Sequence, residues 1–204
     1  VGMILSLAAC GNGGNSGGSN NASASGQTQG EAKTEVDDTV QGVTDTEIKV
    51  GNTAAVSGAY APVGVPFIAG IESYFKMIND QGGIDGRKIT FVHKDDEFDP
   101  VKGKAYLQEM VEDEKVFAIV GHFGTPVVAA TIDDLKSYGI PSVYFATGIG
   151  QLYAEHAETN ADGYNLFPVQ PIYTTEGQIM VARGIGTFNA KKIGIIYTSD
   201  DAGK

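Results

Sequence analysis

The chain from position 116 to 126 is Val116-Phe117-Ala118-Ile119-Val120-Gly121-His122-Phe123-Gly124-Thr125-Pro126. Its first five residues form a short, continuous apolar run, which is typical of a parallel strand covered on both faces. The Thr-Pro pair after the loop predicts an N-cap and a first helical position, so we expect a helix from Thr125 to about Tyr138. Strand, loop and helix in this order indicate an α/β fold.

The same alternation continues on both sides of this stretch. Strands are expected at residues 48–50, 89–91, 116–120, 141–145 and 192–197, with an extended segment at 164–169. Further helices are expected from Pro66 to a stop at Gly82-Gly83, from Pro100 to about Glu114, near 151–156 and at 174–188. A long turn-rich loop is expected at 51–64. Alternation this regular predicts a doubly wound, mostly parallel sheet with right-handed crossovers.

The helix that begins at Pro100 carries two local predictions. Asp99 is expected to cap its first turn, because an Asp-Pro pair combines an N-cap with a proline at the first helical position. Val101, Ala105 and Val111 are expected to mark part of its buried face.

The only cysteine, Cys10, follows Leu7-Ala8-Ala9 at the end of an apolar stretch. Residues 11–30 follow it, and fifteen of these twenty are Gly, Ser or Asn. The arrangement resembles a bacterial lipoprotein signal, in which the cysteine is lipidated and a flexible tether follows. The alternative, a cysteine buried in a core, is disfavoured because such a tether cannot build a core around it. We therefore expect a partial signal peptide at 1–9 and a lipidated Cys10 with a flexible, then acidic, linker at 10–46.

Composition excludes some functions. The net charge is −11, of which residues 31–46 contribute −4, so the body from 47 onward carries −7. Nucleic acid is therefore not expected as a partner, because phosphate binding needs a basic face. The N-terminal apolar run is shorter than the ~20 residues that span a bilayer. We expect a body that only the lipid holds to the membrane.

Enzyme and metal motifs are mostly missing. No Gly-x-Gly-x-x-Gly motif follows the first strand, and no Gly-x-Ser-x-Gly motif occurs. His93, His122 and His156 have no metal-like spacing, so each is interpreted as structural or solvent-facing. The acidic run at 95–99 could suggest a cation site, but we interpret it as a loop whose last residue caps a helix. No catalytic residue, metal or cofactor is predicted.

Polar loops at the carboxyl ends of the strands remain as candidate sites. In open α/β sheets, ligands bind at these ends. The three loops are Ser57-Gly58-Ala59-Tyr60, Phe123-Gly124-Thr125 and Ala146-Thr147-Gly148. A helix N-terminus with a hydroxyl at its cap suits a carboxylate, although Thr125 could be a plain cap and Thr147 a turn residue.

These features resemble a type I periplasmic binding protein of the branched-chain amino acid (Leu/Ile/Val-binding) group, the receptor subunits of ABC importers. The resemblance covers residues 47–204. Its most specific stretch is Asn79-Asp80-Gln81-Gly82-Gly83-Ile84-Asp85-Gly86, supported by Ile48-Lys49-Val50-Gly51, Ser57-Gly58, Asp95-Asp96, Asp99-Pro100, Ile119-Val120-Gly121-His122, Pro171, and Tyr173 with Glu176-Gly177. It implies a ligand-binding first lobe at 47–170, and a crossover with an incomplete start of a second lobe at 171–204.

The resemblance also implies a site for the carboxylate and ammonium groups of an amino acid in a cleft between two lobes. Thr125 falls where the family uses a serine hydroxyl and a backbone N–H for the carboxylate. Ala146 and Thr147 fall in the loop that supplies a backbone group and a hydroxyl to the ligand. The remaining candidates are Tyr173, which falls at a crossover position, Gly124 in the loop before Thr125, and Phe123, Tyr60 and Val63 at the cleft wall.

Two departures from the family leave the ligand open. Phe98 and Gly124 stand where the leucine-binding members carry a disulfide, so that pair is replaced together. A tyrosine that the family uses from the second lobe aligns near Ala202. The preferred ligand therefore need not carry a leucine side chain. The Ala-Thr-Gly and Tyr-x-x-Glu-Gly features are more similar to those of relatives that bind other small carboxylates.

The resulting functional prediction is an extracytoplasmic, lipid-anchored solute receptor that binds an amino acid or similar small carboxylate by hinge closure and delivers it to ABC permease subunits. One alternative is a ligand-sensing receptor domain of the same fold that signals instead of transporting. An enzyme on an α/β scaffold is a weaker alternative, because no nucleophile, base or metal constellation can be assembled.

Overall fold

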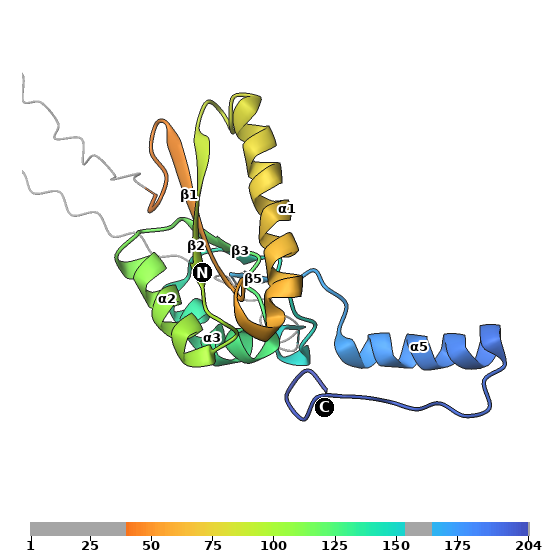
Figure 1. The fold of residues 1–204 in the computed structure, drawn as a ribbon. Helices are drawn as coiled ribbons and strands as arrows, with labels where there is room; N and C mark the ends of the chain where they lie inside the picture. The colour runs from red at the N-terminus through yellow and green to blue at the C-terminus, as the bar shows by residue number, and fades with distance from the viewer. Residues whose placement is uncertain (1–39, 154–164, 204) are drawn as a thin grey trace, which may run out of the picture. The chain divides into compact units, whose positions relative to one another are not determined.

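A computed structural model describes residues 40–153 and 165–203 of the chain (Figure 1). The expected signal segment, Cys10, most of the linker and His156 lie outside these residues. The predictions for lipidation and tethering therefore stay predictions.

The described residues form one parallel sheet in the strand order β2-β1-β3-β4-β5. The strands are β1 (Glu47–Ala54), β2 (Lys88–Asp95), β3 (Ala118–Val120), β4 (Ser142–Val143) and β5 (Leu166–Phe167). The longest pairing joins β1 and β2, from Glu47 opposite Lys88 to Ala54 opposite Asp95. The predicted α/β fold with a parallel sheet is confirmed.

Helices cover both faces of this sheet (Figure 1). They are α1 (Ala61–Asp80), α2 (Pro100–Glu112), α3 (Thr125–Tyr138) and α5 (Tyr173–Phe188), with a short 3₁₀ turn, η1 (Gly58–Tyr60), before α1 and helical residues at 150–153. The helix α1 packs on one face, whereas α2 and α3 pack against each other on the opposite face. The sheet is thus doubly wound, as predicted.

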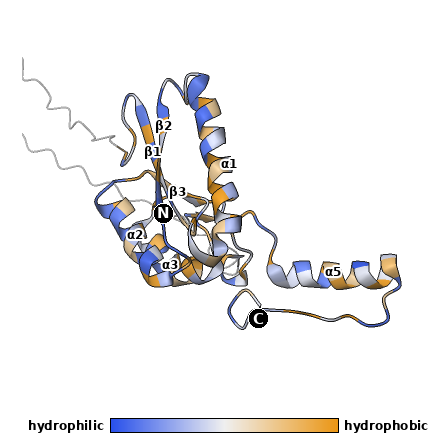
Figure 2. Cartoon of the chain, viewed as in Figure 1, coloured by the Kyte–Doolittle hydropathy of each residue, from blue (hydrophilic) through white to orange (hydrophobic). Residues whose placement is uncertain are grey.

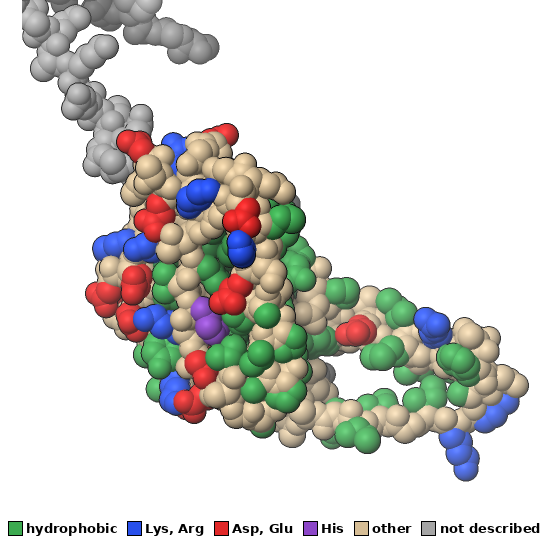
Figure 3. Space-filling view, turned by 45° about the horizontal axis from the view of Figure 1, so that its top comes forward, with side chains coloured by type: hydrophobic (Ala, Val, Ile, Leu, Met, Phe, Trp, Pro, Cys, Tyr) green, Lys and Arg blue, Asp and Glu red, His purple; other side chains and the backbone are tan. Residues whose placement is uncertain are grey.

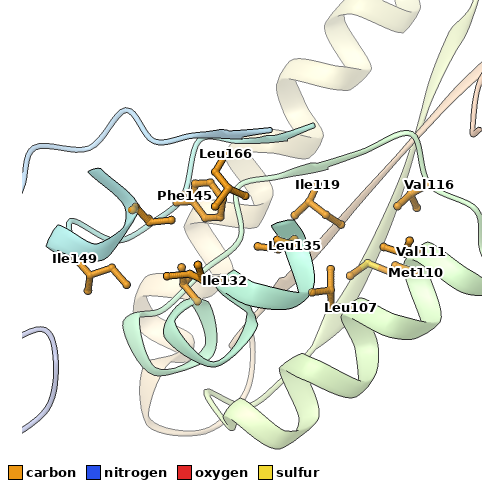
Figure 4. Packing of buried hydrophobic residues seen from close by; sticks show 12 residues of the cluster. Leu107, Met110, Val111, Val116, Ile119, Ile132, Leu135, Phe145, Ile149 and Leu166 are labelled. Carbon is orange, nitrogen blue, oxygen red and sulfur yellow. The ribbon is translucent and has the colours of Figure 1, made fainter. Parts of the chain in front are cut away.

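Each face of the sheet has its own apolar core. The larger cluster lies under α2 and α3 and includes Leu107, Ile119, Leu135 and Phe145, which Figure 4 shows pointing into the space between the helices and the sheet. The smaller cluster lies under α1 and includes Ile68. Hydrophobic positions accordingly run along the strands and the sheet-facing sides of the helices in Figure 2.

The first strand and the first helix are both longer than the sequence predicted. The strand β1 continues to Ala54, and α1 begins at Ala61, so the expected loop at 51–64 shrinks to a few residues. Pro62 occupies the start of the helix, where its missing N–H costs no hydrogen bond, and Pro66 lies inside it. The earlier proline is therefore the true start signal. The predicted stop holds, because α1 ends at Asp80, just before Gly82 and Gly83.

The predicted buried face of α2 is wrong in part. Val111 is buried, but Val101 is 76% exposed and Ala105 is exposed as well. The buried positions are Gly103, Leu107, Met110 and Val111. At about 100° per residue, Val101 and Ala105 lie on the side of the helix opposite to Leu107.

Three further strand predictions need correction. The third strand begins at Ala118 instead of 116, and the fourth contains only Ser142 and Val143. Residues 192–197 form no strand in the described part of the chain, and Ile195 and Tyr197 are exposed. An apolar run becomes a strand only when a neighbouring strand accepts its hydrogen bonds, and none lies beside this segment among the described residues.

Candidate functional site

The strand order creates a crevice at the carboxyl ends of β1 and β3. The chain leaves β1 for the edge strand β2, crosses back to β3 on the other side of β1, and then continues to β4 and β5. Loops that follow β1 and β3 therefore diverge in opposite directions. In open α/β sheets, ligands bind at such a switch point.

A pocket of about 710 Å³ lies at this crevice. This volume falls within the range of small-molecule sites. The loops after β1, β2, β3 and β4 and the first part of α1 supply one wall, and residues 169–173 and 198–202 supply the remainder. Six of the seven predicted ligand-binding residues line the pocket, as does Val63; the six are Tyr60, Phe123, Gly124, Thr125, Ala146 and Tyr173.

Two threonine hydroxyls form the polar end of the site. Thr125 is the first residue of α3, and Thr147 follows β4; their Oγ1 atoms share a hydrogen bond of 2.7 Å, and both side chains are buried. A bridge between Phe123 and Ala146 joins the two loops. Thr147, the seventh predicted residue, is not among the pocket-lining residues. Its link to the pocket is the hydrogen bond to Thr125. When Thr147 donates, the hydroxyl hydrogen of Thr125 is free to point towards the pocket.

The predicted N-cap role of Thr125 is wrong. Gly124 is the N-cap residue of α3, and no side chain accepts a hydrogen bond there. The first N–H groups of an α-helix have no partner within the helix, and Pro126 has no N–H to offer. The start of α3 thus presents backbone N–H donors and the Thr125 hydroxyl on the side of the pocket, an arrangement that suits an anion.

Gly124 lets two loops approach each other closely. Its φ of 91° lies in a region that L side chains rarely adopt, and a Cβ atom there would lie 2.5 Å from the ring of Phe98. The two positions where the leucine-binding members were expected to have a disulfide are therefore in direct contact here. The phenyl ring fills the space above the glycine.

Several lining residues were not predicted from the sequence. They are Phe67, Phe98, Tyr144, Phe145, Val169, Gln170, Pro171, Thr198, Asp200 and Ala202. Phe67 lies inside α1 and Tyr144 directly after β4, in segments predicted only as a helix and a strand. Tyr144 and Phe145 directly precede the predicted residue Ala146, which is the one sequence signal that could have indicated their place.

The acidic loop after β2 has the predicted structural role. Asp99 caps α2 by accepting hydrogen bonds from the N–H groups of Val101 and Lys102. Burial alone would raise the pKa of Asp95, but hydrogen bonds from Ser57 and from the backbone of Glu97 and Val56 lower it below its usual value. Among the residues that the structure describes, no group of three or more His, Cys, Asp or Glu side chains is placed to hold a metal ion.

A buried polar chain fastens α3 to the sheet. Thr131 Oγ1 donates to the carbonyl of Val127 (2.9 Å), so it can accept from Nε2 of His122 (2.9 Å). Nδ1 of His122 then accepts from Thr53 Oγ1 of β1 (3.1 Å). These partners assign a neutral imidazole with its proton on Nε2. The predicted structural role of His122 is thus confirmed.

His122 should make stability depend on pH. Burial lowers its pKa in the folded chain to about 4, whereas the unfolded value is near 6.5. As pH falls through this window the unfolded chain binds the proton first, so the free energy of unfolding should fall by about 3 kcal/mol between pH 6.5 and 4. Chemical denaturation across this range measures the effect.

The matched variant is His122→Gln, which cannot titrate. Other groups, such as His93, titrate in both proteins, so the difference between the two pH profiles isolates His122. The variant's profile should be flatter between pH 6.5 and 4. Parallel profiles would show that His122 is not buried in its neutral form.

Charges on the described surface are mixed. On the face that Figure 3 shows, Lys and Arg side chains lie among Asp and Glu side chains. Six ion pairs lie among the described residues, such as Lys76 with Asp80 and Lys102 with Glu97. No helix among the described residues combines the length and hydrophobicity needed to cross a membrane.

A doubly wound lobe with a pocket at its switch point, one polar end and apolar walls, defines a ligand-binding module of the α/β class. Comparison with known proteins identifies the family. Residues 47–204 match the model of the periplasmic binding protein family, to which the chain therefore belongs. Within it, the chain is a type I periplasmic binding protein of the group that contains the Leu/Ile/Val-binding proteins.

Individual members of the family share moderate sequence identity with this chain. The Leu/Ile/Val-binding protein homolog 2 of Brucella abortus is 32% identical over 99 residues, which are 48% of this chain and 26% of that protein. The branched-chain amino acid transporter substrate-binding protein of Streptococcus pneumoniae, solved with isoleucine, is 26% identical, with a TM-score of 0.63 over 72% of this chain and 40% of that one. A solute-binding protein of an ABC transporter from R. palustris, solved with benzoate, is 28% identical, with a TM-score of 0.59 over 70% of this chain and 38% of that one. The chain spans 26% to 41% of the length of the first relatives that it matches.

Proposed function

We propose that this protein is the solute receptor of an ABC importer and that it binds an amino acid or a similar small carboxylate in the pocket at the β1/β3 switch point. One observation carries the proposal. The N-terminus of α3 and the Thr125 hydroxyl line a pocket of about 710 Å³ whose other walls are largely apolar. A carboxylate at the polar end and an apolar body along the walls match this arrangement.

The cellular setting is part of the same proposal. The family is that of periplasmic binding proteins, so we place the protein outside the cytoplasmic membrane. Lipidation of Cys10 would hold it at the membrane surface, and ABC permease subunits would receive the ligand. A second lobe would close over the pocket by a hinge motion. The ligand would favour the closed state to the extent that it binds the closed state more tightly than the open one.

A thermal-shift screen of the purified protein against amino acids and small carboxylates tests the proposal. A ligand at a hundred times its Kd should add about 2.7 kcal/mol to the free energy of unfolding. A clear shift with any member supports a solute receptor. No shift with amino acids or carboxylates would reject the proposed ligand class.

Thr125→Ala should weaken binding of the carboxylate found in that screen by about 1–3 kcal/mol, which is about 5- to 150-fold in Kd. The substitution removes a hydroxyl that would donate to a charged group. Titration calorimetry on both proteins gives the ratio. Thr125→Ser, which keeps the hydroxyl, is the matched control and should bind within a few-fold of the parent. Equal affinity of the alanine variant would remove Thr125 from the site.

A further inference from the structure

Aromatic rings form a continuous wall in this pocket. Tyr60 stacks on Phe98 with ring centroids 3.6 Å apart and an angle of 16° between the planes. Phe98 meets Phe123 edge to face at 6.2 Å, and Phe123 meets Phe67 at 5.7 Å. Phe67 in turn lies parallel to Tyr144 at 6.3 Å. All five rings line the pocket.

These rings come from separate parts of the chain. They are supplied by η1, α1 and the loops after β2, β3 and β4. Core packing alone does not explain the wall, because Tyr60 is 41% exposed and Tyr144 is 53% exposed. Tyr144 also adopts a φ of 58°, which is rare for an aromatic residue. The wall therefore offers accessible ring faces and edges to the pocket.

The polar end of the pocket favours an anion. The Thr125 hydroxyl and the N-terminus of α3 donate hydrogen bonds at one end. Among the described lining residues the one carboxylate is Asp200. Its Oδ1 already accepts from the Thr198 hydroxyl at 2.6 Å and from the N–H of Ala202 at 3.1 Å, within its own turn. Oδ1 of Asp200 is therefore held within its own turn, and the donors at the start of α3 are the groups placed to bind a carboxylate.

We propose that the pocket selects a carboxylic acid whose body is a flat aromatic ring, in preference to one with an aliphatic body. The inference rests on the proposed function and narrows its ligand class. The carboxylate would lie at the start of α3, and the ring would stack or meet edge to face with the aromatic wall. Aromatic pairs prefer these geometries and gain more from them than from area burial alone.

Titration calorimetry with matched ligands tests the proposal. Benzoate and cyclohexanecarboxylate have the same carboxylate and the same number of carbon atoms, but only benzoate has a flat π-system. Benzoate should bind about fivefold or more tightly than cyclohexanecarboxylate, and more tightly than leucine. Equal binding of the two ring acids would overturn the proposal.

Variants locate the effect. Tyr60→Leu keeps an apolar side chain and removes an exposed ring, so it should reduce the preference for benzoate over cyclohexanecarboxylate by about threefold or more without unfolding the protein. Tyr74→Leu, at an exposed position of α1 outside the pocket lining, is the matched control and should leave the preference unchanged. An unchanged preference in Tyr60→Leu would remove the Tyr60 ring from recognition and overturn the proposed wall.

The outcomes separate the two proposals. Tight binding of leucine with weak binding of benzoate would overturn the aromatic preference and leave the proposed receptor function intact. If leucine, benzoate and cyclohexanecarboxylate all failed to bind, and no other member of the screen shifted stability, both proposals would be rejected.

Discussion

Gly64→Ala should lower the free energy of unfolding by about 3 kcal/mol or more, because overpacking against a fixed backbone forces the chain to move. A Cβ atom at this position would lie 1.8 Å from the carbonyl oxygen of Ala55, which is fully buried after β1. Alanine would therefore push the first turns of α1 away from the sheet. Chemical denaturation of the parent and the variant measures the loss.

The same substitution elsewhere in α1 provides the control. A Cβ atom at Gly70 would meet nothing within 4 Å, and glycine inside a helix costs about 0.5–1 kcal/mol relative to alanine. Gly70→Ala should therefore raise the free energy of unfolding by roughly that amount. The two substitutions should thus change the free energy of unfolding in opposite directions. If Gly64→Ala left this free energy unchanged, α1 would not approach Ala55 as closely as described.

Gly124→Ala should damage both stability and ligand binding. Alanine is strained at a φ of 91°, which costs about 1–3 kcal/mol, and its Cβ atom would overlap the ring of Phe98 at 2.5 Å. Relief of this overlap must shift the loop or the ring, and Thr125 follows directly in the chain. We expect a loss of about 3 kcal/mol or more in stability and a loss of tenfold or more in affinity, measured by denaturation and calorimetry.

Gly86→Ala separates strain from overlap. Gly86 also has a positive φ, 82°, but nothing lies within 4 Å of its Cβ position, and it is in the turn before β2, outside the pocket lining. This variant should lose about 1 kcal/mol of stability and keep its affinity. If Gly124→Ala behaved in the same way, contact with Phe98 would have no part in shaping the site.

The fold was predictable where one local signal determines one element. Asp99-Pro100 combines a cap and a fixed φ, and the structure confirms both. The run at 116–120 is apolar on both faces, so only a buried parallel strand suits it, although the strand itself starts at Ala118. Where two signals competed, as for Pro62 and Pro66, the sequence alone did not identify the start of the helix.

The polar end of the site was predictable, but the aromatic wall was not. Thr125 and Ala146 lie in or at the end of the loops that follow β3 and β4, so the rule for carboxyl ends of parallel strands finds them. Phe67 and Phe98 reach the pocket because a helix and a remote loop fold back over it. Contacts of this kind depend on tertiary packing, and the periodicity of a sequence does not predict tertiary packing.

The hydrogen-bonded chain from Thr53 through His122 to Thr131 has a mechanical consequence. Thr131 lies on α3, about two turns from Thr125, and is tied through the imidazole to β1, the strand between β2 and β3. Rotating α3 by one residue, about 100°, would break the hydrogen bond between Thr131 and His122 and leave the buried Nε2–H of His122 without a partner. These hydrogen bonds therefore oppose both rotation and sliding of α3 on the sheet. Because Thr125 lies on the same helix, this side of the pocket is held rigidly against the sheet.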